Sequence, residues 1–309
     1  MENIEFPVVH YKQGFVITQE GEAVPSRFYI VKSGRVTLTT NANKPLRRDG
    51  GNLKEGDFFD VAACLAGKKS TTRAVAETDV TLTYIERDKF HDFIGGNLAL
   101  TNKIVAFLSG RLRFLNECLA HGEDSNVVSE SSLTTIYTNA EYYRSKKMFM
   151  QSFCAYKKYL LVCPDGQNAE LAEQMVNNMQ KYGKDIRFDY TEKELRRFYP
   201  KGALIFSEAE HGTEMFVIKK GKINITKIVD DNEIVLAVLK QGDILGEMGL
   251  IEQKPRSANA IAAEDCEIMA IARAVYLPLL KDGNAILERI CMTLASRICN
   301  MHERIAKGV

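Results

Sequence analysis

The chain contains one sequence module twice, and this internal repeat constrains its fold more than any other feature. The matching pairs are residues 11–17 with 199–205 (YKQGFVI, YPKGALI), 28–36 with 215–223 (FYIVKSGRV, MFVIKKGKI), and 56–59 with 242–245 (GDFF, GDIL). The separation drifts only from 188 to 186 residues, so the copies differ by few insertions. Each copy occupies roughly 100–120 residues, which is a normal domain size. Two similar domains are therefore predicted.

Within each copy the residues favour β-strands. Runs such as residues 234–239 are rich in β-branched side chains, and glycines and charged turns separate the runs at intervals of about 8–12 residues. This rhythm is typical of an antiparallel sandwich or barrel. Gly34 and Gly221 lie between two runs, where a turn with positive φ favours glycine.

Each copy ends in a predicted amphipathic helix. Residues 284–307 carry apolar side chains at steps of three and four: Ile286, Ile290, Leu294, Ile298, Met301 and Ile305. Residues 98–119 show the same spacing. Such a stripe packs either on its own barrel or on a partner helix, so a homodimer through the C-terminal helix stays open.

The segment between the copies is predicted to be a linker followed by helices. Residues 121–133 contain clusters of Gly, Asp, Ser and Glu and indicate a linker. Large and small residues over 136–164 resemble one tetratricopeptide repeat, whose period is about 34 residues, and 169–181 form a further amphipathic stretch. A single repeat cannot bury its face alone. We therefore expect a helical spacer docked on a barrel rather than a peptide-binding array.

These patterns predict the fold class α+β: two antiparallel β jelly-roll-like barrels with flanking helices, connected by a helical spacer. The predicted domains are residues 1–120, 121–184 and 185–309.

One segment, residues 246–260 (GEMGLIEQKPRSANA), differs from ordinary β sequence. It predicts a short helix over 247–251, a loop broken at Pro255, and then a strand. A helix N-terminus offers free N–H groups to an anion, and Arg256 can add a forked, permanent charge for a phosphate. The Glu247 carboxylate can accept hydrogen bonds from a sugar hydroxyl. The segment has no nucleophile–base pair and no paired carboxylates at catalytic spacing, so we expect binding and not catalysis.

The same segment resembles the phosphate-binding cassette of the cyclic nucleotide-binding domain family. The family pattern is G-E-(L/I/M)-(A/G)-L followed by P-R-(A/S/T)-A, and every element is present from Gly246 to Ala258 with the family's spacing. Residues 256–303 also run in register with the bacterial catabolite activator type. The resemblance covers 198–309 strongly and 6–119 weakly.

The resemblance implies a role for each cassette residue. Glu247 would bind the ribose 2′-OH, Arg256 the cyclic phosphate, and Ser257 would offer a hydroxyl beside it. Backbone N–H groups of Met248 and Gly249 would complete the phosphate site. Three residues of the last helix fall near the stretch that covers the base in the family: Arg297, which could stack or hydrogen-bond, Met301 and His302. A plain helix-surface role is the alternative for each of them. The predicted ligand-binding residues are Gly246, Glu247, Met248, Gly249, Leu250, Arg256, Ser257, Ala258 and Arg297. An internal ion pair between Glu247 and Arg256 is the structural alternative.

The implied ligand is cAMP or cGMP. Ser257 favours cAMP, because bacterial cAMP receptors often carry Ser at this position and cGMP-dependent kinases carry Thr. The sequence does not exclude a cyclic dinucleotide as the ligand. It predicts no metal and no other cofactor, since the five histidines share no metal-ligand spacing.

The first copy lacks the charged groups of the cassette. Val61 takes the place of the Glu, Ser70 that of the Arg, and Asp60 that of the first Gly. Losing two charge-assisted bonds, each about 1.5–3 kcal/mol, weakens binding by roughly two to four orders of magnitude. We therefore predict that this barrel does not bind a cyclic mononucleotide in the family manner. This domain could still bind a different anionic ligand through three basic residues: Lys68, Lys69 and Arg73.

Charge and composition limit the other kinds of partner that the chain can have. Lys+Arg is 41 and Asp+Glu is 40, a balance that argues against a dedicated nucleic-acid binder. No apolar run approaches the ~18 residues of a membrane span, and the first residues lack a signal-peptide pattern. The seven cysteines form no CxxC pair, which indicates reduced thiols and a cytoplasmic chain.

We therefore predict a non-enzymatic cyclic nucleotide sensor that signals to an unidentified downstream protein. The alternative is a scaffold in which both barrels are structural and bind no nucleotide.

Overall fold

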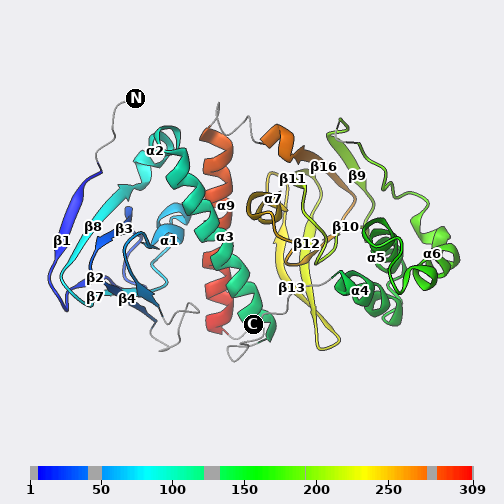
Figure 1. Cartoon of the computed structure of the whole chain (residues 1–309), viewed down its shortest axis with the longest axis horizontal. Helices are drawn as coiled ribbons and strands as arrows, with labels where there is room; N and C mark the ends of the chain where they lie inside the picture. Colours follow the sequence, from blue (N-terminus) through cyan, green and yellow to red (C-terminus); the bar gives the residue numbers. More distant parts are fainter. Residues whose placement is uncertain (1–5, 41–50, 122–132, 192, 277–283, 308–309) are drawn as a thin grey trace. The chain divides into compact units, whose positions relative to one another are not determined.

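The two copies of the repeat fold into the same arrangement of strands (Figure 1). The structure, a computed structural model, describes residues 6–40, 51–121, 133–191, 193–276 and 284–307. The chain divides into a first compact unit, residues 1–116 with 278–309, and a second compact unit, residues 117–277. No helix in these described ranges is long and apolar enough to cross a membrane.

The first compact unit contains two four-stranded sheets, with strand orders β1-β8-β3-β6 and β2-β7-β4-β5. All pairings are antiparallel. The strands are β1 Val8–Tyr11, β2 Val16–Thr18, β3 Arg27–Ser33, β4 Val36–Thr39, β5 Asn52–Leu53, β6 Phe58–Phe59, β7 Arg73–Ala76 and β8 Val80–Glu86. The helices are α1 Val61–Ala66, α2 Phe90–Gly96, α3 Leu98–His121, whose last residues belong to the second unit, and α9 Asn284–Lys307.

The second compact unit repeats both sheets, with strand orders β9-β16-β11-β14 and β10-β15-β12-β13. Its strands are β9 Arg196–Tyr199, β10 Leu204–Phe206, β11 Glu214–Lys220, β12 Ile223–Val229, β13 Asn232–Leu239, β14 Ile244–Leu245, β15 Asn259–Ala262 and β16 Cys266–Ala272. Its helices are α4 Thr134–Ser145, α5 Phe149–Val162, α6 Ala169–Gly183 and α7 Glu247–Glu252. The predicted fold class, two antiparallel barrels with flanking helices and a helical segment between them, is confirmed.

The turns that carry the chain from one sheet to the other, between β3 and β4 and between β11 and β12, explain the repeated glycines. Gly34 and Gly221 have backbone φ angles of 86° and 89°, which residues with a side chain rarely adopt. A Cβ atom at Gly221 would lie 2.6 Å from the carbonyl oxygen of Asp265, so the turn excludes any larger residue.

Helices α4, α5 and α6 share one core with the second barrel. The fully buried Tyr143 and Tyr156 belong to the same cluster as Leu204 and Ala260 of the sheet. Polar contacts add to it, because the Tyr143 hydroxyl donates to Glu233 Oε1 at 2.9 Å. The prediction that the helices dock on a barrel is confirmed. Their likeness to a tetratricopeptide repeat stays a prediction.

Helix α9 belongs to the first compact unit, whereas the sequence grouped it with residues 185–309. Its apolar stripe, which includes Ile290 and Leu294, is buried, and the helix packs on α1 and α2. Lys68 Nζ donates to Asn300 Oδ1 at 2.7 Å and to Glu303 Oε1 at 2.8 Å. The periodicity fixed which face of the helix is buried, but it carried no information about the surface that covers this face.

Helix α9 also brings a histidine against α3. His302 Nε2 lies 3.3 Å from Arg111 Nη2, and burial together with the Arg111 charge lowers the pKa of His302 to about 3. An unfolded histidine titrates near 6.5, so the unfolded chain binds more protons below this pH and the free energy of unfolding falls as pH falls. We expect a loss of about 1.4 kcal/mol for each pH unit between 6.5 and about 3.

Urea unfolding of the parent and of His302→Gln at pH 7 and pH 5 measures this loss. The variant is expected to lack that part of the pH dependence. His91→Gln is the control, because the hydrogen bond that the His91 ring donates to the Glu288 carboxylate raises the pKa of His91 and gives a contribution of opposite sign, lost as pH rises. Equal pH dependence in the parent and in His302→Gln would contradict the assignment.

Candidate functional site

The segment that the sequence singled out forms a short helix between two strands. Helix α7 starts directly after Gly246, which follows β14, and it ends one residue later than predicted. Gly246 has φ 76° and ψ 1°, a left-handed conformation that suits a residue without a side chain. The first N–H groups of the helix have no partner within the helix.

Arg256 is the central charged group of this site. It is only 5% exposed, and its Nη2 donates to the Glu214 carbonyl oxygen at 2.6 Å while Nη1 donates to the Gly246 carbonyl oxygen. Its Cζ lies 4.5 Å from the centre of the Phe206 ring, a cation–π contact. These contacts hold the guanidinium at the N-terminal end of α7.

The guanidinium occupies a crevice lined by glycines. A Cβ atom added at Gly212 would lie 2.9 Å from Arg256 Cζ, and one added at Gly249 would lie 3.2 Å from Nη1. A Cβ atom at Gly246 would lie 2.5 Å from Nη1. Any larger residue at these positions would displace the guanidinium. The sequence motif contains Gly246 and Gly249, but it gave no signal for Gly212, Phe206 or Glu214.

The other cassette residues lie on or next to α7. Glu247 is 1% exposed in the first turn, and Met248, Gly249 and Leu250 are buried behind it. Ser257 is half-buried beside Arg256. Ala258 is buried next to the start of β15. A buried carboxylate and a buried guanidinium thus flank the start of one helix, an arrangement that can bind a phosphate and a hydroxyl together.

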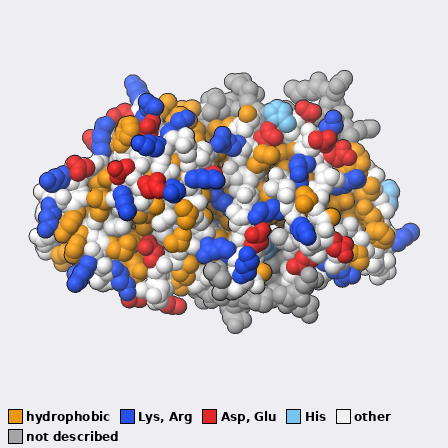
Figure 2. Space-filling model, turned by 180° about the vertical axis from the view of Figure 1, so that it is seen from behind, with side chains coloured by type: hydrophobic (Ala, Val, Ile, Leu, Met, Phe, Trp, Pro, Cys, Tyr) orange, Lys and Arg blue, Asp and Glu red, His pale blue; other side chains and the backbone are white. Residues whose placement is uncertain are grey.

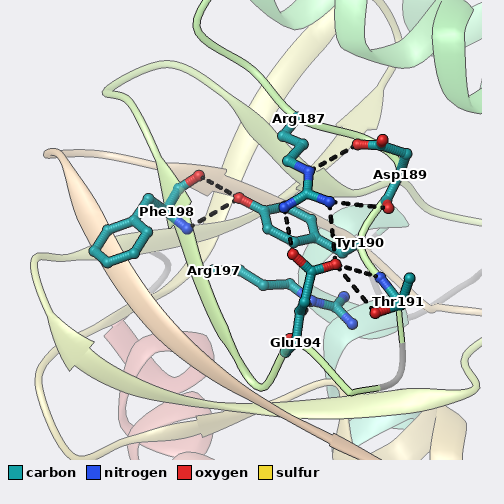
Figure 3. A network of polar contacts seen from close by, with 7 residues as sticks. All are labelled: Arg187, Asp189, Tyr190, Thr191, Glu194, Arg197 and Phe198. Carbon is teal, nitrogen blue, oxygen red and sulfur yellow. Dashed lines mark hydrogen bonds and ion pairs between the residues drawn. The ribbon is translucent and has the colours of Figure 1, made fainter.

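A polar network supports the strand that carries Glu214. Arg197 makes two bonds to the Glu214 carboxylate, at 2.7 Å and 2.5 Å. The Tyr190 ring lies between two guanidinium groups, with Cζ of Arg187 and Arg197 at 4.9 Å and 5.0 Å from its centre (Figure 3). The Tyr190 hydroxyl donates to the Phe198 carbonyl oxygen at 3.2 Å. These contacts tie Tyr190 to β9 and fix the side chain of Glu214, whose carbonyl oxygen accepts from Arg256.

Comparison with known proteins identifies the fold. The sequence profile described as "Cyclic nucleotide-binding domain" matches two segments, residues 8–97 and 196–282, which together make up more than half of the chain. The chain belongs to the cyclic nucleotide-binding domain family. The two matched segments are called the first and the second cyclic nucleotide-binding domain below.

Curated relatives match about a third of this chain. The chain is 34% identical over 104 residues to the cyclic AMP receptor protein of Thermus thermophilus, covering 33% of this chain and 48% of that one. It is 29% identical over 109 residues to the cAMP-activated global transcriptional regulator CRP of Escherichia coli O157:H7, covering 35% and 52%. The chain thus spans about half the length of these curated relatives.

Solved structures of the family also align. One titled "cAMP bound PfPKA-R (141-441)" is 18% identical and covers 96% of this chain and 80% of that chain, with a TM-score of 0.29. A cyclic nucleotide-binding domain from Methylobacillus flagellatus is 24% identical and covers 40% and 78%, with a TM-score of 0.35. The family assignment rests on the sequence match.

The first cyclic nucleotide-binding domain repeats the backbone of the cassette without its charges. Asp60 has φ 58° and ψ 7° directly before α1, the position and conformation of Gly246 before α7. The Ser70 backbone bonds to Gly21 N and Ala23 O at 2.9 Å and 3.2 Å, as the Arg256 backbone bonds to the corresponding loop of the second domain. The geometry therefore confirms the alignment of Ser70 with Arg256.

Arg297 is the one predicted ligand residue that lies in the other compact unit from the cassette. It is half-buried on α9, whose apolar face packs in the first compact unit. Its role as a contact to the base stays a prediction.

Proposed function

We propose that the second cyclic nucleotide-binding domain binds a cyclic purine nucleotide and that the chain is a non-enzymatic regulatory sensor. The observation that supports this proposal most strongly is the buried guanidinium of Arg256, held in a glycine-lined crevice at the start of α7 with Glu247 in the first helical turn. The cyclic phosphate would bind Arg256 and the N–H groups of Met248 and Gly249, and the ribose 2′-OH would bind Glu247.

The bonds of Arg256 suggest how binding changes the domain. Its two terminal nitrogens donate to neutral carbonyl oxygens of Gly246 and Glu214. A bond from a guanidinium to a phosphate oxygen is roughly twice as strong as one to a neutral acceptor. A bound phosphate would therefore take over donors from these carbonyls and shift the balance of contacts between α7 and β11. Such an exchange is a population shift that a ligand can drive.

The preferred nucleotide is cAMP. Ser257 follows Arg256, as in the cAMP-receptor pattern, and the two bacterial relatives above carry cAMP in their names. We further propose that the sensor acts in the cytoplasm through a partner protein and without nucleic acid. The net charge is +1, and on the one face that Figure 2 shows, acidic side chains are interspersed among the basic ones. A broad basic surface of the kind that docks on nucleic acid is not seen there.

Isothermal titration calorimetry with cAMP, cGMP and a cyclic dinucleotide tests the proposal. We expect saturable binding of a cyclic mononucleotide at one site per chain, because the first domain lacks both charged groups. Glu247→Gln removes one charge-assisted bond, about 1.5–3 kcal/mol, and should weaken binding by roughly 10- to 100-fold. Glu252→Gln, at the opposite end of α7, is the matched control and should bind as the parent does.

The scaffold alternative gives a different result. A ligand at a hundred times its Kd raises the free energy of unfolding by about 2.7 kcal/mol, which a thermal shift detects. If no cyclic nucleotide produces heat or a thermal shift, the sensor function is refuted in favour of the scaffold, in which neither barrel binds a nucleotide.

A further inference from the structure

The first cyclic nucleotide-binding domain contains a cavity at the place where the second domain carries Arg256. The cavity has a volume of about 320 Å³, within the range of small-molecule sites. Buried Tyr29, Asp60 and Ser70 line it on the inside, and the exposed residues Glu22 and Ser26 line it toward solvent. It therefore has a closed inner part and a mouth through which a ligand can enter.

Two substitutions between the domains explain why this space is open. Thr18 pairs with Ala74 as Phe206 pairs with Ala260, each at the same irregularity in its strand pair. Ser70 stands in the place of Arg256, as the backbone bonds show. In the second domain the guanidinium stacks on the Phe206 ring and fills the crevice. A serine and a threonine in place of an arginine and a phenylalanine leave that volume empty.

The buried charged group also differs in sign between the two domains: it is the Asp60 carboxyl in the first and the Arg256 guanidinium in the second. Asp60 is 8% exposed, and its carboxylate lines the cavity. Oδ1 accepts a hydrogen bond from the Ser70 hydroxyl at 2.6 Å, whereas Oδ2 is buried and has no hydrogen-bond partner among the described residues. Burial raises the pKa of Asp60, and its interactions with the Ser70 and Thr18 hydroxyls offset only part of this shift.

The chemistry of the cavity selects a donor and excludes an anion. A buried acceptor without a partner is unfavourable, and a bound N–H donor with positive charge removes this penalty. The ring of Tyr29, stacked on Phe59 at 4.9 Å, offers an aromatic wall to such a cation. Arg27 also lines the cavity, but its guanidinium is stacked on the Tyr84 ring at 4.3 Å. A cyclic phosphate would instead meet the Asp60 carboxylate.

We propose that this cavity is a binding site for a small organic cation, a protonated amine or a guanidinium compound, held by Asp60 and Tyr29. The anionic ligand that the sequence left open is not supported by the geometry. None of Lys68, Lys69 and Arg73 lines the cavity, and Lys68 is bonded to Asn300 and Glu303 of α9.

Calorimetric titration of the full chain with agmatine and butane-1,4-diamine tests the site. We expect saturable binding of at least one of these amines, at least tenfold weaker in Asp60→Asn, which keeps the shape of the side chain and removes its charge. Thr18→Phe places the ring of the second domain into the cavity and should reduce binding by a similar factor. Asp88→Asn is the matched control, because Asp88 is exposed in the same domain and does not line the cavity.

Two further measurements separate a loss of amine binding from misfolding and from effects on the second domain. Circular dichroism melting shows whether each variant folds, and if Asp60→Asn does not, Thr18→Phe decides alone. Titration with cAMP reports on the second domain and should be the same in all variants, so failure of this proposal is separate from failure of the sensor function.

Three results would overturn the proposal. One is no saturable binding of either amine up to about 10 mM, a concentration ten times the Kd of a weak millimolar ligand. Another is unchanged amine binding in both Asp60→Asn and Thr18→Phe. The third is binding of the neutral nucleoside adenosine at this site in the absence of amine binding.

Discussion

Arg256→Lys is expected to lower the affinity for a cyclic nucleotide by about a hundredfold, although it keeps the positive charge. A lysine presents one compact ammonium group, whereas the Arg256 guanidinium reaches the carbonyl oxygens of Gly246 and Glu214 and lies over the Phe206 ring. An ammonium group cannot make the forked contact to a phosphate, and it loses the stacking on the ring. Arg256→Ala should weaken binding further, because it also removes the charge.

The measurement is calorimetric titration with cAMP and cGMP, with a thermal melt of each variant. Arg273→Lys is the matched control, since Arg273 lies in the same domain and Nη1 donates to the carbonyl oxygen of Leu250 in α7 at 3.0 Å. It should change nucleotide affinity by less than a factor of about three. Parent-like affinity in Arg256→Ala would show that the phosphate binds elsewhere.

Gly183→Ala is expected to destabilise the second compact unit by about 3 kcal/mol. Gly183 is the last residue of α6, and a Cβ atom there would overlap the ring of Phe153. Phe153 is buried in the core that α5 and α6 share with the barrel, so the ring has no open space into which it could move. Overpacking of this kind forces side chains out of their preferred rotamers or shifts the backbone.

The control is the same substitution in another helix. A Cβ atom at Gly110, which is exposed within α3, would meet nothing within 4 Å. Gly110→Ala should therefore stabilise the chain by about 0.5–1 kcal/mol through helix propensity. Urea unfolding of both variants measures the two effects, and equal midpoints for Gly183→Ala and the parent would contradict the packing argument.

The repeat and the cassette were predictable because their signals are local. The strand pattern, the glycine at the start of α7 and the spacing between Glu247 and Arg256 all lie within short stretches of chain. The loss of charge in the first domain was predictable for the same reason, since Val61 and Ser70 stand in the aligned segment. The docking of the central helices on a barrel followed from the rule that a single helical hairpin cannot bury its own face.

Features that depend on contacts between distant residues were not predictable. Gly212 and Phe206 line the guanidinium crevice, but they lie outside the motif and join it only through strand pairing. The cavity around Asp60 depends on Thr18, which corresponds to Phe206 only once the register of β2 with β7 is known. The partner of α9 was hidden for a similar reason, because its stripe would suit any apolar surface.

The docking of α9 on α1 has a consequence for the way this protein is made. Lys68 and Asn300 bond to each other across 232 residues of sequence, so the first barrel leaves the ribosome long before the helix that covers it. Synthesis at about 5–20 residues per second would leave α1 uncovered for roughly 10–50 seconds. During that interval the exposed apolar surface is open to chaperones or to another nascent copy, and the second compact unit can finish folding first.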